Sequence, residues 1–183
     1  FSGCNLWSGR EQDRAKVACQ FCDTDFVGTD GPGGGRFDTV EELGEAIECA
    51  WDNAARPALV VFTGGEPLLQ LDVALIGEMH RRGFQIALET NGTIEAPDGI
   101  NWICVSPKSD QELKQRSGSE LKLVYPQPLA DPARFAGLAF DHFFLQPMDG
   151  PELEQNIAAA VSYCLANPRW RLSLQTHKMI GIA

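Results

Sequence analysis

The chain has 183 residues, of which 44% are hydrophobic and 22% charged, a balance typical of a single globular domain. Its formal net charge of −10 and its 15 scattered Lys and Arg residues argue against polynucleotide binding, which normally needs a basic patch. The longest apolar runs are much shorter than the about 20 residues of a membrane span, and no signal-peptide pattern opens the chain. We therefore expect one domain over residues 1–183 of a cytoplasmic protein that binds neither nucleic acid nor membrane.

The first half of the chain alternates between helix-like and strand-like segments. Thr39 has the features of a helix N-cap, and Glu42, three residues later, is placed as its capping-box partner. Gly83 ends a second apolar-periodic segment, as glycine often does after a helix. These signals predict a helix over 40–53, a strand over 59–63, a helix over 68–82 and a strand over 85–89.

The second half continues with short apolar runs that end at polar residues or proline. They predict strands over 102–105, 121–125, 143–145 and 172–175, and a helix over 151–166. The connections over 106–121 and 126–143 barely reach the about dozen residues of a parallel crossover, so we expect short or degenerate helices there. Apolar strands separated by helices favour an α/β fold with a parallel sheet covered on at least one face.

Polar residues directly follow five of the predicted strands. In parallel α/β sheets, ligands gather beyond the carboxyl ends of the strands. Five polar strand ends together are what one edge of an active site would look like. They read Thr63-Gly64-Gly65-Glu66, Glu89-Thr90-Asn91-Gly92, Ser106-Pro107-Lys108, Gln146-Pro147-Met148-Asp149 and Gln175-Thr176-His177-Lys178.

Three of the six cysteines are clustered early in the chain, at Cys4, Cys19 and Cys22. The spacing of Cys19 and Cys22 lets two sulfurs reach one metal centre, and Cys4 becomes a third ligand if residues 5–18 loop back. Three thiolates on a cubane iron–sulfur cluster leave one iron open to a substrate or cofactor. Two alternatives remain open: a zinc site, which usually needs a fourth ligand, and a thioredoxin-like redox pair.

The other three cysteines are isolated within apolar patterns, at Cys49, Cys104 and Cys164. In a reducing cytosol, clustered cysteines indicate metal binding or catalysis more than disulfides. Isolated ones are better interpreted as small buried core residues, and we expect that of these three.

Several motifs of the chain resemble those of the radical S-adenosylmethionine superfamily. Phe21 matches the aromatic residue before the third cysteine of that superfamily, and residues 64–66 match its Gly-Gly-Glu segment. The chain departs from the usual motif in having fourteen rather than three residues between its first two cysteines. More narrowly, nearly the whole chain is similar to the family of 7-carboxy-7-deazaguanine synthases. The shared pieces are Cys22-Asp23-Thr24, Thr63-Gly64-Gly65-Glu66-Pro67-Leu68, Glu89-Thr90-Asn91-Gly92, Val105-Ser106-Pro107-Lys108, Phe144-Leu145-Gln146-Pro147-Met148 and Gln175-Thr176-His177-Lys178.

The resemblance implies a fold and a chemistry. The fold is a partial (β/α)6-type radical SAM barrel with degenerate helices in its second half. Such enzymes, which are lyases of queuosine and deazapurine biosynthesis, use a 4Fe–4S cluster, S-adenosylmethionine and Mg²⁺. The reduced cluster donates an electron to the sulfonium, and the 5′-deoxyadenosyl radical takes a hydrogen atom from C6 of 6-carboxy-5,6,7,8-tetrahydropterin. The ring contracts to 7-carboxy-7-deazaguanine and ammonia leaves.

The family also implies partners and a longer chain. Its members are homodimers that take electrons from a donor such as flavodoxin. They carry a strand and a glycine-containing loop before the first cysteine. Phe1-Ser2-Gly3 resembles the end of that loop, so we expect the preceding strand and loop to be missing here.

The resemblance also assigns roles to individual residues. Cys4, Cys19 and Cys22 would hold the cluster, and Thr24 would contact Mg²⁺. Glycines at 64 and 65 permit a close backbone approach, and a carboxylate at 66 can accept hydrogen bonds from the ammonium of the cofactor. The cofactor-binding set is Phe21, Asp23, Gly64, Gly65, Glu66, Ser106, Lys108 and Gln146, and the substrate-binding set is Thr63, Glu89, Asn91 and His177. No catalytic residue beyond the cluster and cofactor is expected.

Each of these residues also has a simpler structural interpretation. Residues 63–67 could be a plain strand-to-helix turn, Asn91-Gly92 an ordinary turn pair and Thr24 a residue that stabilises its own loop. Two other functions stay open as well. One is a different radical S-adenosylmethionine enzyme, such as a glycyl-radical activase. The other is a non-catalytic iron–sulfur protein, although an electron carrier has no use for a Gly-Gly-Glu segment that binds an amino acid.

Overall fold

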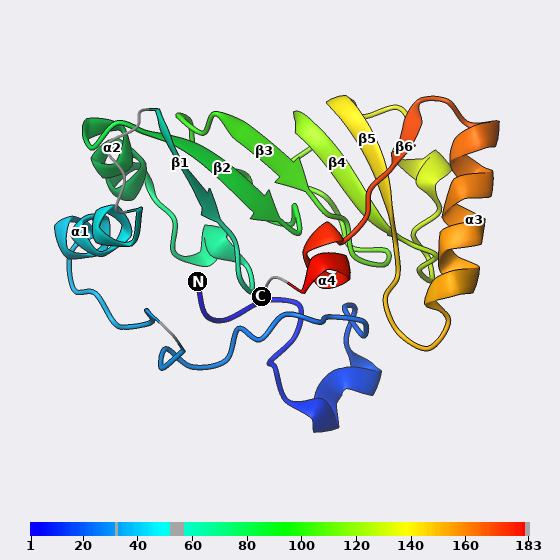
Figure 1. Ribbon diagram of the computed structural model, residues 1–183, viewed down its shortest axis with the longest axis horizontal. Helices are drawn as coiled ribbons and strands as arrows, with labels where there is room; N and C mark the ends of the chain where they lie inside the picture. The colour runs from blue at the N-terminus through cyan, green and yellow to red at the C-terminus, as the bar shows by residue number, and fades with distance from the viewer. Residues whose placement is uncertain (32, 52–56, 182–183) are drawn as a thin grey trace. The chain divides into compact units, whose positions relative to one another are not determined.

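The computed structural model describes residues 1–31, 33–51 and 57–181 of the chain (Figure 1). These residues form two compact units. The first comprises Phe1–Thr90 and Ile94–Ile103, and the second comprises Asn91–Thr93 and Cys104–Ala183. Hydrogen bonds join the strands in the order β1-β2-β3-β4-β5-β6, and the strand pairs are parallel. The predicted α/β fold with a parallel sheet is therefore confirmed.

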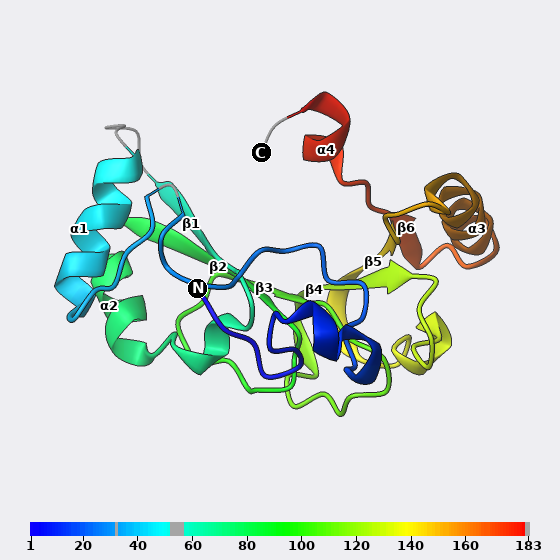
Figure 2. The same cartoon turned by 90° about the horizontal axis from the view of Figure 1, so that it is seen from below.

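The described part of the first unit includes two complete strands and two α-helices, which lie together in Figures 1 and 2. The elements are η1 (Glu11–Lys16), α1 (Val40–Trp51), β1 (Ala58–Phe62), η2 (Pro67–Leu69), α2 (Val73–Arg81) and β2 (Phe84–Thr90). Strands β1 and β2 pair in parallel from Ala58↔Phe84 to Phe62↔Leu88. The predicted strands over 59–63 and 85–89 are confirmed to within one residue at each end.

Helix α1 begins where the capping-box motif places its start. The amide of Glu42 donates to Thr39 Oγ1 at 3.2 Å, as an N-cap hydrogen bond does. The Glu42 carboxylate accepts from the amide of Asp38 at 2.9 Å, one residue before the expected partner. The predicted C-terminal end of this helix, at residue 53, lies outside the described residues.

The single helix predicted over 68–82 is wrong, because the structure divides it in two. Only η2 and α2 are helical, and the intervening residues leave the helical conformation. Asp72 starts the second piece as an N-cap, accepting from the amide of Leu75 at 2.9 Å. The helix ends where expected, since Gly83 has a φ of 80° that favours glycine.

A hydrophobic core lies between the helices and one face of the first strands. Alternate residues of β2, from Phe84 to Thr90, are buried, so this face carries the core. Leu43, Ile47 and Trp51 of α1 pack against it, whereas Ala50 is exposed. The buried residues of this core are Ala58, Phe62, Leu68, Leu71, Leu75, Ile76, Met79, Phe84, Ile86 and Leu88.

The second unit is built with less helix. Strand β3 (Trp102–Val105) leads from the first unit into the second. The elements after β3 are β4 (Ser117–Tyr125), η3 (Pro132–Arg134), β5 (Ala139–Pro147), α3 (Leu153–Ala166), β6 (Trp170–Leu172) and α4 (Thr176–Ile180). Between β3 and β5 the described residues contain only the three-residue η3 as helix, which confirms the degenerate crossovers. Strands β4 and β5 are longer than predicted, because their first residues pair from Ser117↔Ala139 onward.

Two predictions are wrong: the position of the last strand and the burial of one isolated cysteine. The last strand was predicted over 172–175, but β6 ends at Leu172 and α4 starts four residues later. Of the three isolated cysteines, Cys104 is buried, Cys164 is partly buried and Cys49 is exposed on α1, so the core interpretation of Cys49 is wrong. The apolar periodicity of α1 did not reveal that Cys49 lies on the exposed side of the helix.

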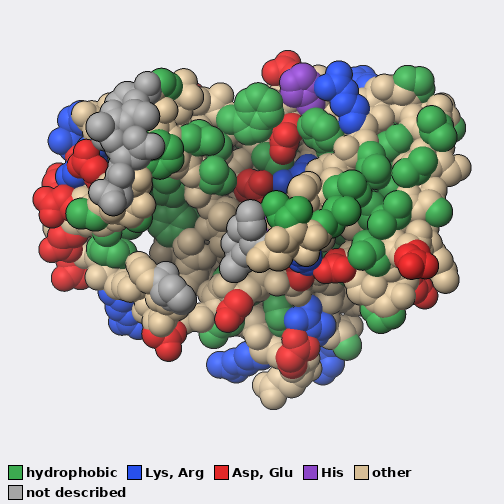
Figure 3. Space-filling view, viewed as in Figure 1, with side chains coloured by type: hydrophobic (Ala, Val, Ile, Leu, Met, Phe, Trp, Pro, Cys, Tyr) green, Lys and Arg blue, Asp and Glu red, His purple; other side chains and the backbone are tan. Residues whose placement is uncertain are grey.

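The surface agrees with the acidic composition. Figure 3 shows Asp and Glu side chains gathered over α1, whose first turn carries Glu41 and Glu42. Within the described residues, no helix is both long and apolar enough to cross a membrane.

Candidate functional site

The cysteine loop, which we define as residues 4–22, belongs to the first unit. Cys19 is buried, and Cys4 and Cys22 are partly buried; none of the three forms a disulfide. The amide of Leu6 donates to the sulfur of Cys4 at 3.4 Å. Such an N–H group stabilises a thiolate and is a common feature around iron–sulfur ligands.

The donor set of this loop fits an iron–sulfur cluster. Within the described residues, no three His, Cys, Asp or Glu side chains lie close enough together to hold one metal ion. A cubane cluster bonds each cysteine through a different iron atom, so its ligands need not converge on one point. A structural zinc ion needs four ligands around a single centre, and the described residues offer no such group. Three soft thiolates on one loop therefore fit the cluster better than zinc.

A single arginine organises the cysteine loop. Arg14 donates from Nη1 to the carbonyl oxygens of Gln20 at 3.0 Å and Cys22 at 3.1 Å. Its hydrogen bond to the Glu11 carboxylate is the main cause that raises the pKa of the guanidinium, and the nearby Cys22 and Cys19 thiolates raise it further. Polar contacts therefore hold η1, which buries no residue, while Trp7 and Cys19 on either side of it are buried.

A pocket of about 320 Å³ opens beside the third cysteine. Several oxygen-bearing side chains line it, and these are the ligands that Mg²⁺ prefers. Asp23 and Thr24, both exposed, belong to its wall. Its full lining is Trp7, Gly9, Glu11, Arg14, Cys22, Asp23, Thr24, Asp25, Phe26 and Val27. Phe21 is partly buried next to this segment but does not line the pocket.

The glycine segment, residues 63–66, lies directly against the start of the chain. The amide of Gly65 donates to the carbonyl of Phe1 at 3.1 Å, and that of Glu66 donates to the carbonyl of Gly3 at 2.9 Å. A Cβ added to Gly64 would lie 2.1 Å from the Phe1 oxygen, and one on Gly65 would lie 1.9 Å from the Gly3 oxygen. The two glycines thus admit the backbone that leads into Cys4.

Glu66 is fully buried and anchors the turn after β1. Its Oε1 accepts from the amide of Leu68 at 3.1 Å and from the hydroxyl of Thr90 at 2.7 Å. A buried carboxylate needs such donors, because its desolvation is otherwise costly. The glycine segment therefore does serve as a strand-to-helix turn, as the simpler interpretation held, and its proposed contact with a cofactor would come in addition.

Thr90 was missed by the sequence reasoning, which selected its neighbour Glu89. Side chains alternate along a strand, so Thr90 shares the buried face of β2 with Leu88, while Glu89 is on the opposite face and partly exposed. This alternation was visible in the sequence. The exposed Thr63, the other predicted substrate residue of this unit, accepts through its carbonyl from the backbone nitrogen of Phe1 at 2.8 Å.

The second unit carries the other predicted site residues. Lys108 Nζ donates to Ser106 Oγ at 2.6 Å, so these two cofactor candidates contact each other. The loop that bears them is held by Gln127, a buried residue that sequence reasoning missed. Gln127 donates to the carbonyl of Pro107 at 3.1 Å and accepts from the amide of Ser109 at 3.0 Å. No local sequence signal pointed to it, because it comes from the loop after β4.

The remaining candidates of this unit lie in varied surroundings. Asn91 is buried, and its Oδ1 accepts from the amide and hydroxyl of Thr93, which is the ordinary turn that the simpler interpretation described. Gln146 is partly buried near the end of β5. His177 is exposed on α4, whose neighbouring Lys178 forms an ion pair with Asp149 at 2.5 Å.

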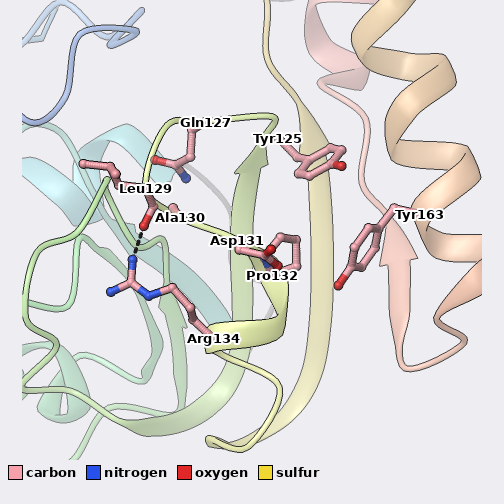
Figure 4. Close-up of a pocket in the computed structure, with 8 residues that line it drawn as sticks. All are labelled: Tyr125, Gln127, Leu129, Ala130, Asp131, Pro132, Arg134 and Tyr163. Carbon is pink, nitrogen blue, oxygen red and sulfur yellow. Dashed lines mark hydrogen bonds between the residues drawn. The ribbon is translucent and has the colours of Figure 1, made fainter.

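A second pocket, larger than the one beside Cys22, contains none of the predicted site residues. It measures about 410 Å³ and lies in the second unit between the loop after β4 and helix α3 (Figure 4). Two tyrosines point into it, and Arg134 donates to the carbonyl of Leu129 at its edge. Burial is the main cause that raises the pKa of the Tyr163 hydroxyl. Its lining is Tyr125, Gln127, Leu129, Ala130, Asp131, Pro132, Arg134 and Tyr163.

Comparison with known proteins agrees with these motifs. The model of the radical SAM superfamily matches residues 13–112. A protein of Caulobacter vibrioides called 7-carboxy-7-deazaguanine synthase is 64% identical over 182 residues, covering all of this chain and 87% of the relative. The chain belongs to the 7-carboxy-7-deazaguanine synthase family. Another member, from Bradyrhizobium diazoefficiens, is 62% identical over the same coverage.

A solved structure of this family supports the fold. The crystal structure of QueE from Escherichia coli matches with a TM-score of 0.57 at 27% sequence identity. The match covers 75% of this chain and 63% of that chain. As a radical SAM synthase, the chain is a lyase whose family uses S-adenosylmethionine and a 4Fe–4S cluster, and the predicted partial barrel is confirmed as six parallel strands that do not close.

Proposed function

We propose that this chain converts 6-carboxy-5,6,7,8-tetrahydropterin to 7-carboxy-7-deazaguanine with loss of ammonia, a step of queuosine and deazapurine biosynthesis. The observation that carries the proposal is the 64% identity to a 7-carboxy-7-deazaguanine synthase over the entire chain. The same identity favours this activity over a glycyl-radical activase or a non-catalytic iron–sulfur protein.

The cysteines and the glycine segment give the chain its part in this chemistry. Cys4, Cys19 and Cys22 would hold the 4Fe–4S cluster. When bound, the cluster and S-adenosylmethionine supply the radical chemistry. The buried Glu66 carboxylate and its two glycines would bind the methionine end of the cofactor, and the protein orients the reactants and excludes water.

Further cofactor and substrate contacts remain proposals supported by the family resemblance. We propose that Phe21, Asp23, Ser106, Lys108 and Gln146 complete the cofactor site. For the substrate we propose Thr63, Glu89, Asn91 and His177, because carboxylate and amide groups match the donors and acceptors of a pterin edge. We also propose a cytoplasmic homodimer that receives electrons from a donor such as flavodoxin; a reducing compartment suits the free cysteines.

A product assay tests the proposed reaction. The reconstituted protein is incubated without oxygen with a chemical reductant, S-adenosylmethionine, Mg²⁺ and the carboxypterin, and the products are identified by mass. We expect 7-carboxy-7-deazaguanine from the wild-type protein and none from the Cys22→Ala variant. Cleavage of S-adenosylmethionine without any deazaguanine product would contradict the proposed substrate.

We propose further that Mg²⁺ binds beside Thr24 and offsets the charge of the substrate carboxylate. The pocket wall supports this, because Asp23, Thr24 and Asp25 offer oxygen atoms next to Cys22. Thr24→Ala should raise the Mg²⁺ concentration needed for half-maximal turnover while the iron content stays the same, and Thr24→Ser should restore it. Turnover that is indifferent to added Mg²⁺ and to a chelator would remove the ion from the site.

A further inference from the structure

The contacts of Arg14 extend across the whole cysteine loop. Its Nε and Nη2 donate to the Glu11 carboxylate, with the shorter Nε contact at 2.8 Å, and its Nη1 donates to two carbonyl oxygens between Cys19 and Cys22. One side chain thus joins η1 to the turn that carries two of the three cysteines. The planar guanidinium suits this bridging, because its donors point in fixed directions.

A buried aromatic platform fixes the guanidinium in place. Its central carbon lies 4.0 Å from the ring centroid of Trp7. Trp7 is 6% exposed, and its ring meets Phe26 edge-on at 5.5 Å. The indole N–H also donates to the carbonyl of Arg10 at 3.2 Å. Stacked on one face and hydrogen-bonded at its edges, the Arg14 side chain has little freedom to move away from the cysteine turn.

The position of this charge has an electrical consequence. The guanidinium lies beside the backbone of the cysteine turn, with Nη1 at 3.0 Å from the Gln20 carbonyl oxygen and 3.1 Å from that of Cys22. An iron–sulfur cluster gains negative charge on reduction, and its potential depends on nearby charge and on hydrogen bonds. A fixed cation beside two ligands therefore stabilises the reduced form and raises the reduction potential.

We propose that Arg14 is a positioning residue for the cluster: it holds the backbone of the Cys19–Cys22 turn in ligand geometry and places a fixed positive charge beside these two cysteines. The proposal rests on the proposed role of Cys4, Cys19 and Cys22 as cluster ligands. It gives a function to the long segment between the first two cysteines. That segment carries Trp7, Glu11 and Arg14, and so supplies the support that a short motif could not contain.

Two properties of the reconstituted protein separate geometry from charge. The first is the rate at which a chelator removes iron, and the second is the midpoint potential of the cluster in a redox titration. Arg14→Met should lose iron roughly tenfold faster, because the turn loses its two hydrogen bonds from the guanidinium, and its potential should fall. Arg14→Lys keeps the positive charge but loses the planar set of guanidinium donors. It should therefore lose iron faster than wild type while its midpoint potential stays nearly unchanged. Lys16→Met, an exposed cation of the same short helix, is the matched control and should change neither.

The outcomes distinguish failure of this inference from failure of the cluster assignment. If Arg14→Met and Arg14→Lys both match Lys16→Met in iron loss and in potential, Arg14 has no positioning role. Should Arg14→Met not fold, Arg14→Lys decides: wild-type iron retention overturns the proposal and faster loss supports it. If Cys22→Ala still assembles a full cluster, the ligand assignment itself is wrong, and the inference about Arg14 falls with it.

Discussion

The cysteine loop and the glycine segment differ in what mainly holds them, although both belong to the first unit and meet at the start of the chain. The glycine segment is fixed by close packing: Glu66 is fully buried and a Cβ on Gly65 would lie 1.9 Å from a backbone oxygen. In the cysteine loop, η1 buries nothing, and Arg14 connects the chain through hydrogen bonds.

Under the proposed function, this difference means that the cluster-binding and the cofactor-binding parts of the site have separate sources of order. Packing against a core needs no ligand, so the glycine segment is shaped before any cofactor binds. Polar contacts at a partly exposed loop contribute much less net free energy, because water competes for the same groups. Binding of a cluster then adds order mainly to the cysteine loop, since metal binding is coupled to folding.

Loss of a cysteine ligand should have the largest effect. We expect it to disturb the cysteine loop and leave the glycine segment unchanged. Cys19→Ala removes one of three thiolates, so we expect reconstituted protein to lose its iron and its broad visible absorbance. Cys49→Ala, at an exposed free cysteine of α1, is the control and should keep both. A Cys19→Ala protein with wild-type iron content would show that this cysteine is no ligand.

A methyl group on the glycine segment should disturb the contact between the two regions. Gly65→Ala forces its Cβ against the Gly3 oxygen and to within 3.1 Å of the Cys4 Cβ. Overpacking of this kind costs about 1–3 kcal/mol of unfolding free energy, measured by urea denaturation. Gly77→Ala on α2 meets nothing within 4 Å and should instead gain about 0.5–1 kcal/mol. Equal stability of the two variants would contradict the close approach.

Neutralising Glu66 should weaken binding of the cofactor and leave the cysteine loop unchanged. Glu66→Gln keeps an oxygen acceptor for Thr90 and Leu68 but loses the negative charge that would pair with an ammonium. We expect affinity for S-adenosylmethionine to fall roughly ten- to a hundredfold, or on the order of 1.5–3 kcal/mol, in calorimetry on cluster-loaded protein. The exposed Glu95→Gln serves as control. An unchanged dissociation constant would remove Glu66 from the cofactor site.

Removal of the hydroxyl that supports Glu66 should have the smallest effect. Thr90→Val preserves the shape of the side chain and deletes the donor that lies 2.7 Å from Glu66 Oε1. Because the Leu68 amide still donates to the same carboxylate, the unfolding free energy should fall by only about 1 kcal/mol. Thr29→Val, at an exposed loop position, should be neutral in the same denaturation experiment. If the two variants are equally stable, Thr90 contributes nothing to the glycine segment.

The amino-acid sequence by itself determined the class of fold and predicted which three cysteines hold the cluster. Strand and helix periods are local properties, so β1, β2, β3 and α1 were predicted to within a residue or two at the ends that the structure describes. Capping at Thr39 was equally readable, since both partners lie within one turn. The motifs around the cysteines and Gly-Gly-Glu were sufficient to indicate the family.

Only the tertiary structure decided how those residues are held. Asp72 divided one apolar period into two helices, because an N-cap contact outweighed the continuation of the pattern. Thr90 contacts Glu66 across 24 residues, and Gln127 contacts Pro107 across 20, and neither pairing leaves a local signal. Arg14 is the same case within the cysteine loop, where its fork meets carbonyl oxygens six and eight residues away. Whether such residues meet depends on how the whole chain folds, and the local sequence around each residue does not show it.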